Sequence, residues 1–104
     1  MKEIGDQEFD SAVAGGAVLV DFGAEWCGPC RVMEPMMEKF AAEYSGRLSV
    51  YTVDTEKEPE LAARQGVMSL PTFIIFKGGQ PVERIVGALS EKDFRKKLEP
   101  HVGA

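Results

Sequence analysis

Hydrophobic residues along the chain follow two different periods. Residues 17–22 and 73–76 are short, nearly unbroken apolar runs, which are typical of strands covered on both faces. Over residues 29–44, apolar side chains such as Met33 and Met37 recur at the spacing of one helix face. The chain is therefore expected to alternate between strands and helices.

Local signals mark the ends of these elements. Asp6 and Ser90 are suitable N-caps for the first and last helices, and Pro100 is expected to end the last one. Gly78 and Gly79 predict an antiparallel hairpin between the last two strands. The expected helices run from Asp6 to the Gly15, Gly16 pair, over residues 29–44 and 59–65, and from Ser90 to Pro100; the expected strands are residues 17–22, 48–53, 72–77 and 82–86, with a small strand near residues 2–4.

This order of elements predicts the fold class. The strand–helix–strand first half needs crossover helices and parallel pairing, whereas the second half adds an antiparallel hairpin and a covering helix. We expect an α/β protein with a central mixed β-sheet flanked by helices. At 104 residues, the whole chain, 1–104, is expected to form a single domain.

Composition narrows the classes of function. Twelve basic and 17 acidic residues give a net charge of −5, which disfavours binding to nucleic acid or to an anionic membrane surface. No apolar stretch approaches the roughly 18 residues that suggest a membrane span, and the first residues are polar where a signal peptide has an apolar core. We expect a cytoplasmic protein and, without an extra apolar face, a monomer.

The two cysteines, Cys27 and Cys30, lie three residues apart at the expected start of the longest helix. This spacing puts both sulfurs on one side of a helical turn. Unpaired N–H groups and the helix dipole there favour a thiolate, so the pKa of Cys27 is expected to be lowered. The arrangement supports thiol–disulfide exchange, in which the exposed Cys27 attacks and the more buried Cys30 resolves the mixed disulfide.

Asp21 is the second candidate for chemistry. It lies within the apolar run 17–22, on the same face as Ala17 and Leu19, where burial is expected to raise the pKa of its carboxyl. A carboxyl of this kind can accept the Cys30 proton during resolution. The alternative is a strand-end aspartate that is exposed to solvent or bonded to the backbone.

Several segments together resemble the thioredoxin family. They are Val20-Asp21-Phe22, Ala24-Glu25-Trp26-Cys27-Gly28-Pro29-Cys30-Arg31, Pro35, Leu70-Pro71-Thr72 and Val86-Gly87-Ala88. They occur in the family's order and at similar separations, so the resemblance covers essentially the whole chain. It implies a thioredoxin fold and the activity of a protein-disulfide reductase.

The resemblance also implies roles for individual residues. Cys27 would be the nucleophile, Cys30 the resolving thiol and Asp21 the buried acid/base. Pro71 would be a cis-proline facing the dithiol, and the backbone of Leu70 would hydrogen-bond an extended substrate strand. The substrate-contact surface implied by the family consists of Trp26, Gly28, Pro29, Leu70, Pro71 and Gly87.

Further expectations from the resemblance concern partners and two departures from the family pattern. The implied partners are disulfide-containing substrate proteins and a thioredoxin reductase that uses flavin and NADPH, and the domain itself would carry no cofactor.

Gly23 stands where the family usually has a large aromatic residue, which would leave space beside the active-site helix. Val50 stands where the family often has a buried lysine that pairs with the aspartate. The absence of this cation would raise the pKa of Asp21 further.

Three other functions compete with that of a disulfide reductase: zinc binding, disulfide oxidation or isomerisation, and a purely structural interaction. A tetrahedral zinc site needs four ligands. Apart from the two cysteines the sequence has a single histidine, His101, so no zinc site is expected. A more oxidising disulfide oxidase or isomerase would use the same thiols, but Gly28-Pro29 favours reduction by family resemblance. In an interaction module the thiols would be incidental, which the intact pair argues against.

Two further expectations concern surface residues. Met68 is expected to contact substrate, and Glu56, Glu58 and Glu60 are expected to form a solvated face.

Overall fold

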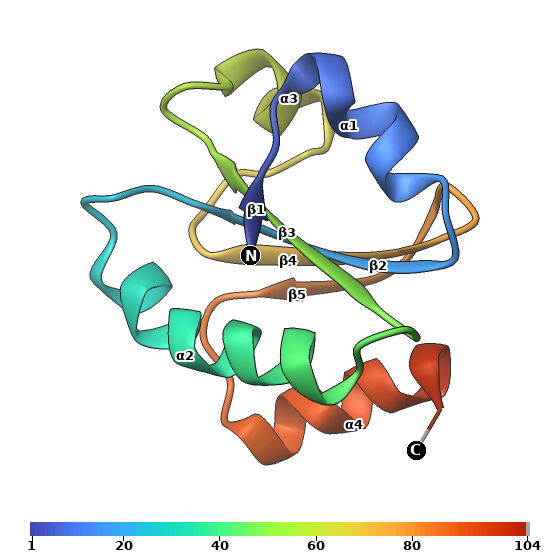
Figure 1. The fold of residues 1–104 in the computed structure, drawn as a ribbon. Coiled ribbons are helices and arrows are strands. Elements are labelled where there is room, and N and C mark those ends of the chain that lie inside the picture. The colour runs from blue at the N-terminus through green and yellow to red at the C-terminus, as the bar shows by residue number, and fades with distance from the viewer. Residues whose placement is uncertain (104) are drawn as a thin grey trace.

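A five-stranded sheet forms the centre of the computed structural model, which describes residues 1–103 (Figure 1). The elements are β1 (Lys2–Glu3), α1 (Asp6–Val13), β2 (Ala17–Gly23), α2 (Gly28–Glu43), β3 (Ser49–Asp54), α3 (Pro59–Arg64), β4 (Thr72–Lys77), β5 (Gln80–Val86) and α4 (Glu91–Val102). The strand order is β1-β3-β2-β4-β5. β1, β3 and β2 pair in parallel, and β2, β4 and β5 pair antiparallel. The mixed sheet expected from the sequence is confirmed.

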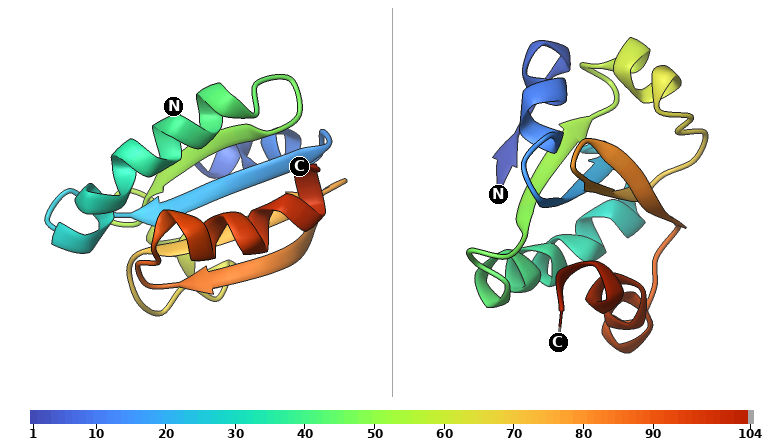
Figure 2. Two further views of the ribbon diagram at one scale, coloured as in Figure 1. Left: turned by 90° about the horizontal axis from the view of Figure 1, so that it is seen from below. Right: turned by 90° about the vertical axis from the view of Figure 1, so that its right-hand side faces the viewer.

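Helices cover both faces of the sheet, with α1 and α3 on one face and α2 and α4 on the other (Figures 1 and 2). Because side chains alternate along a strand, β2 contributes to both cores. Leu19 packs in the same cluster as Phe40 of α2. Val18 and Val20 pack instead with Phe9 of α1. Asp21 therefore faces the α2 side, as its place beside Leu19 predicted.

Two predicted helix caps have different outcomes. Ser90 is confirmed as the N-cap of α4, since its Oγ accepts a 3.2 Å hydrogen bond from the N–H of Asp93. The prediction that Asp6 caps α1 is wrong, because Gly5 occupies the N-cap and Asp6 is the first helical residue. The Asp6 carboxylate forms an ion pair with Arg64 of α3 instead.

The prediction that Pro100 ends the last helix is also wrong, because α4 continues to Val102. Proline removes one backbone donor, which costs a helix stability. Val102, however, packs against the same core cluster as Leu98, one turn earlier. The N–H of Gly103 also reaches the Glu99 carbonyl at 2.8 Å. Burial of the apolar face therefore maintains the helix past the proline.

Two segments that lie far apart in the sequence, residues 22–30 and 70–72, meet at one end of the sheet. The carboxyl end of β2 pairs with the start of β4 through Phe22 and Thr72. Directly before β4, the peptide bond of Leu70-Pro71 is cis, as the family resemblance implied. Leu70 packs against Cys27 and Cys30, which lie where β2 continues into α2. The fold thus places the cysteine pair and the cis-proline segment side by side.

Candidate active site

The cysteine pair lies at the N-terminus of α2. Cys27 is the N-cap residue, Cys30 lies in the first turn, and the two form a disulfide with a Cα–Cα distance of 5.3 Å. The backbone N–H of Cys30 donates a 3.2 Å hydrogen bond to Cys27 Sγ. A donor aimed at sulfur, together with the positive end of the helix dipole, stabilises a thiolate there once the disulfide is reduced. The lowered pKa of Cys27 stays a prediction for the reduced protein.

Cys27 and Cys30 do not differ in exposure in this disulfide form. Cys27 and Cys30 are each 5% exposed, so the prediction of an exposed Cys27 and a more buried Cys30 is wrong for the oxidised state. A disulfide on a single helical turn holds both sulfurs against the same neighbours, Ala24 and Leu70. What distinguishes the two is the space that each lines.

Cys27 lines a surface depression, which we call the Trp26 groove. Its lining residues are Trp26, Cys27, Gly28, Pro29, Thr55, Ala62, Val67, Met68, Ser69 and Leu70. Two large apolar side chains are exposed there, Trp26 at 69% and Met68 at 95%. Solvent-exposed apolar surface beside a reactive group is typical of a binding site. Four of the predicted contact residues, Trp26, Gly28, Pro29 and Leu70, therefore lie together.

The cis-proline segment leaves backbone groups available at this groove. No hydrogen bond within residues 1–103 uses the N–H or the carbonyl of Leu70. The carbonyl of Pro71, in contrast, accepts a 2.8 Å hydrogen bond from the N–H of Gly87. Gly87 has a φ of 87°, a conformation that favours glycine. Gly87 therefore contacts the cis-proline segment and is not among the residues that line the groove.

One side chain that hydrogen-bonds a residue of the Trp26 groove was not predicted from the sequence. Glu56 is exposed, as the expected acidic face requires, and its Oε1 also accepts a 2.6 Å hydrogen bond from the indole Nε1 of Trp26. Glu58 is half-buried, and its carboxylate accepts a 3.0 Å hydrogen bond from the N–H of Asp6. The sequence did contain a signal for this contact. Glu56 follows β3 closely, and the carboxyl ends of parallel strands such as β2 and β3 lie at the end of the sheet that carries the active site.

Asp21 is buried behind the cysteines, at 5% exposure, and its Oδ1 has no hydrogen-bond partner in the described residues. Burial, with a smaller contribution from the charge of Glu34, raises the pKa of its carboxyl from 3.8 to about 7. The exposed-aspartate alternative is therefore wrong. Near neutral pH the group is partly ionised, which is the state that a proton acceptor requires.

The assignment of Val50 to the position beside Asp21 is wrong. In the parallel pairing of β2 with β3, Thr52 stands opposite Asp21, whereas Val50 stands opposite Leu19. Val50 is buried in the core cluster on the α2 side. The neighbour of the aspartate on β3 is thus a neutral threonine, so β3 supplies no cation to Asp21.

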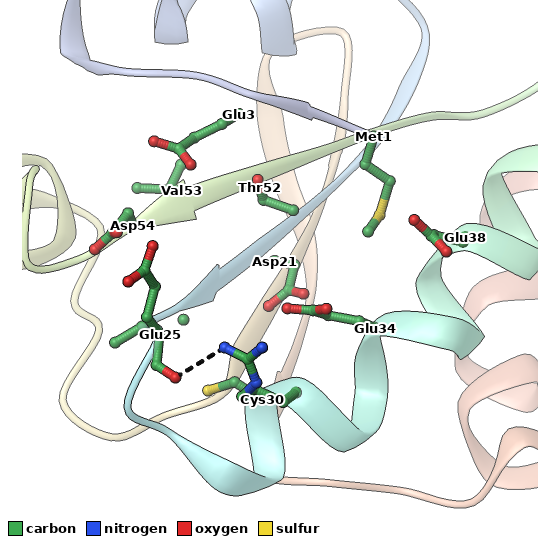
Figure 3. Close-up of a pocket in the computed structure, with 13 residues that line it drawn as sticks. Met1, Glu3, Asp21, Glu25, Cys30, Glu34, Glu38, Thr52, Val53 and Asp54 are labelled. Carbon is green, nitrogen blue, oxygen red and sulfur yellow. Dashed lines mark hydrogen bonds between the residues drawn. The ribbon is translucent and has the colours of Figure 1, made fainter.

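Gly23 packs closely against Cys30, so this position does not have the empty space that its small size predicted. A Cβ atom at this position would lie 3.2 Å from Cys30 Sγ and 3.7 Å from Asp21 Oδ1. The Cys30 sulfur and the Asp21 carboxylate thus both lie close to Gly23. Asp21, Gly23 and Cys30 are among the residues that line a depression of about 240 Å³, which we call the Asp21 pocket (Figure 3). Its lining residues are Met1, Glu3, Asp21, Gly23, Ala24, Glu25, Cys30, Arg31, Glu34, Glu38, Thr52, Val53 and Asp54.

Comparison with known proteins gives the family of this chain. The sequence model of the family described as thioredoxin matches residues 1–100. The chain belongs to the thioredoxin family. A curated thioredoxin of Staphylococcus aureus is 42% identical over 100 residues, which cover 96% of both chains. A solved thioredoxin of Plasmodium falciparum has a TM-score of 0.89 at 31% identity, covering 97% of this chain and 99% of its own. A mutant thioredoxin of Halobacterium salinarum has a TM-score of 0.87 at 30% identity, covering 99% of this chain and 93% of its own.

Membership of the thioredoxin family, together with the proximal cysteine pair, defines the type of activity. The protein is a thiol–disulfide oxidoreductase, and its dithiol serves as a disulfide reductase. The tryptophan before the first cysteine is compatible with the family's active-site segment. In the described part of the chain, no helix has both the length and the apolar character needed to span a membrane.

Proposed function

We propose that Cys27 is the attacking thiolate, Cys30 the resolving thiol and Asp21 the acceptor of the Cys30 proton. The observation that carries this assignment is the separation of the two cysteines between the Trp26 groove, lined by Cys27, and the Asp21 pocket, lined by Cys30. A protein substrate reaches the sulfur that borders the exposed groove. The sulfur that borders a buried carboxyl is instead placed to lose a proton.

The reaction then has two steps. The Cys27 thiolate attacks one sulfur of a substrate disulfide, which forms a mixed disulfide and releases the first substrate thiolate. Cys30 transfers its proton to the Asp21 carboxylate, and the resulting thiolate attacks Cys27 Sγ. The second substrate thiolate leaves, and the Cys27–Cys30 disulfide forms. The substrate gains two electrons and the dithiol loses two.

Substrate binding is proposed to use the Trp26 groove and the backbone of Leu70. The unpaired N–H and carbonyl of Leu70 can hydrogen-bond an extended substrate strand, as in β-strand addition. Trp26 and Met68 supply exposed apolar surface for side chains on either side of the substrate disulfide. Pro71 and Gly87 maintain the shape of this edge through their 2.8 Å hydrogen bond.

The wider setting is proposed from the family. A thioredoxin reductase that uses flavin and NADPH would return the disulfide to the dithiol, so that the protein carries electrons to disulfide-containing proteins. We propose that it works in the cytoplasm as a monomer, with the whole chain acting as one domain. Support comes from the relatedness to thioredoxins over 96% of the chain.

A trapping experiment tests the roles of the cysteines. Cys30→Ser is expected to accumulate mixed disulfides with substrate proteins through Cys27, because no resolving thiol remains. The matched variant is Cys27→Ser, which is expected to trap few. Adducts that form mainly through Cys30 would reverse the assignment.

A coupled assay tests the direction of electron flow. With NADPH, a thioredoxin reductase and a disulfide-bonded protein, we expect NADPH oxidation that depends on both cysteines. Equilibration with glutathione distinguishes a reductase from an oxidase or isomerase of the same fold. A strongly oxidising couple would contradict the proposed direction.

A further inference from the structure

The segment that connects α3 to β4 carries part of the Trp26 groove. We call residues 66–71 the groove loop, and its residues 67–70 line the groove. A 2.8 Å hydrogen bond runs from the Thr72 hydroxyl to the carbonyl of Ser69. Apart from this bond, the loop backbone from Met68 onward makes no hydrogen bond within residues 1–103 until the carbonyl of the cis-proline. The position of the exposed part of the loop therefore depends on how its two ends are held.

Both ends of the groove loop are bonded to β5 or to the residue that directly follows it. At the end nearer to β4, the N–H of Gly87 donates a 2.8 Å hydrogen bond to the carbonyl of Pro71. At the end nearer to α3, the Arg84 guanidinium donates a 2.7 Å hydrogen bond to the carbonyl of Gln65, the C-cap residue of α3. A Cβ atom on Gly66 would lie 3.7 Å from the same arginine nitrogen, so the guanidinium lies against the first loop residue.

The way in which α3 ends explains why the Gln65 carbonyl needs a side-chain donor. The N–H of Gly66, which has a φ of 71°, bonds to the Ala63 carbonyl at 3.0 Å, and the N–H of Val67 bonds to the Ala62 carbonyl at 2.9 Å. These two bonds form a Schellman motif and satisfy carbonyls one turn back, not the carbonyl of the C-cap. Within residues 1–103, no backbone N–H bonds to the Gln65 carbonyl. A cation at this end of a helix also interacts favourably with the helix dipole.

The register of the sheet directs Arg84 to this place. Arg84 stands opposite Ile74 of β4, and Ile74 packs in the core cluster that includes residues of α1 and α3. Because paired residues of neighbouring strands point to the same face of a sheet, Arg84 extends from the face that α3 covers. No carboxylate forms an ion pair with Arg84 within residues 1–103, so the guanidinium has no acidic partner there that competes with the carbonyl.

We propose that Arg84 is a positioning residue for substrate binding. Its hydrogen bond to the Gln65 carbonyl fixes the start of the groove loop, so that the Leu70 backbone and Met68 lie where a substrate strand approaches Cys27. Arg84 is not among the residues that line the groove, so it acts through the loop and does not touch the substrate. This inference rests on the proposed function, in which the groove and the Leu70 backbone bind the substrate.

The first test measures the loop itself by NMR of the oxidised protein, without substrate. Arg84→Met keeps a long apolar side chain and removes the donor and the charge. We expect the amide ¹⁵N order parameters of Met68 and Leu70 to fall from the rigid range of about 0.85 toward the flexible range below about 0.6, and their amide shifts to change. Arg84→Lys retains a donor and is expected to recover part of both effects. Lys77→Met, which removes an exposed cation at the opposite end of β4, is the matched control and is expected to change neither.

The second test measures substrate binding in a single turnover. The reduced protein is mixed with an excess of a disulfide-bonded protein, and its oxidation is followed by the fluorescence of Trp26, the only tryptophan in the sequence. Arg84→Met is expected to raise the half-saturating substrate concentration about two- to fivefold and to leave the limiting rate and its pH profile unchanged. Arg84→Lys is expected to recover part of the loss, and Lys77→Met to behave like the parent. The reaction with bis(2-hydroxyethyl) disulfide, which has no peptide backbone for the loop to bind, is expected to be unchanged in all three variants.

Several results would overturn the positioning role. Unchanged order parameters and amide shifts in Arg84→Met do so whatever the kinetics are. Equal effects of Arg84→Lys and Arg84→Met, or an equally slowed reaction with the small disulfide, do so as well, because the change is then not a loss of loop placement.

Met68→Ser separates this inference from the proposed function, because it removes exposed apolar surface from the groove and leaves Arg84 in place. If Met68→Ser raises the half-saturating concentration and Arg84→Met does not, Arg84 has no positioning role and the groove remains the binding site. If neither variant raises it, binding in the groove is wrong and the role of Arg84 falls with it. The roles of Cys27 and Cys30 are tested separately by trapping.

Discussion

Burial of Asp21 predicts that the folded state becomes less stable as the pH rises. Raising the pKa from 3.8 to about 7 means that the folded state holds the Asp21 proton more tightly than the unfolded chain does. The penalty is absent well below pH 3.8 and complete above about pH 7. At about 1.4 kcal/mol for each tenfold change in proton affinity, the full penalty is about 4 kcal/mol. Between about pH 5 and pH 8 it grows by about 3 kcal/mol.

Asp21→Asn isolates this contribution. The variant keeps the size of the side chain and removes the charge, so its stability relative to the parent is expected to rise by about 3 kcal/mol from about pH 5 to pH 8. Any constant cost of the amide cancels in this difference. Exposed carboxylates such as Glu43 and Glu91, whose pKa values are lowered by hydrogen bonds from Arg95, are present in both proteins.

The assay is urea unfolding followed by circular dichroism, with the free energy of unfolding extrapolated to zero urea at each pH. Both proteins are kept oxidised, because the cysteines then do not titrate. Asp10→Asn, at an exposed site on α1, is the matched control and is expected to show a difference that does not change with pH. A pH-independent difference for Asp21→Asn, or one that falls as the pH rises, would refute the argument that burial dominates the pKa.

Three further predictions concern contacts of the site and the scaffold. Glu56→Ala removes the acceptor of the Trp26 indole N–H and is expected to lower kcat/KM for a protein disulfide by about two- to tenfold, with a change in Trp26 fluorescence; unchanged kcat/KM would exclude a role for this contact. Gly87→Ala is expected to destabilise the fold by about 1–2 kcal/mol in urea unfolding, because φ is 87°, whereas Gly15→Ala, with φ outside the positive range and open space around it, is expected to cost less than about half of that; equal effects would contradict the strain argument. Ser90→Ala is expected to cost about 1 kcal/mol through loss of the cap, and Ser90→Asn to cost little; equal losses would show that the cap does not stabilise α4.

Features that depend on one segment could be predicted from the sequence. The apolar run of β2 predicted a strand covered on both faces, and its alternation placed Asp21 on the face of Leu19. The cysteine spacing placed both sulfurs on one turn at the start of α2. Periodicity and capping act over a few residues, which is why these predictions succeeded.

Features that depend on how segments pack could not be predicted in this way. The prediction for Pro100 failed because the burial of Val102 outweighs the lost backbone donor, and burial is a property of the whole core. The assignment of Val50 failed because the neighbour of Asp21 depends on the register between two strands, and a shift of two residues preserves the same alternation.

Local periodicity and residue chemistry were enough to predict the order of strands and helices and the turn that holds both cysteines, and they led us to expect, without excluding an exposed one, a buried aspartate beside that turn. The packed structure was needed to show that Thr52 stands opposite Asp21, that Glu56 binds the Trp26 indole, and that Cys27 and Cys30 line different depressions. The physical reason is that strand register and long-range contacts are set when all elements pack together at once, so they depend on positions that no single segment encodes.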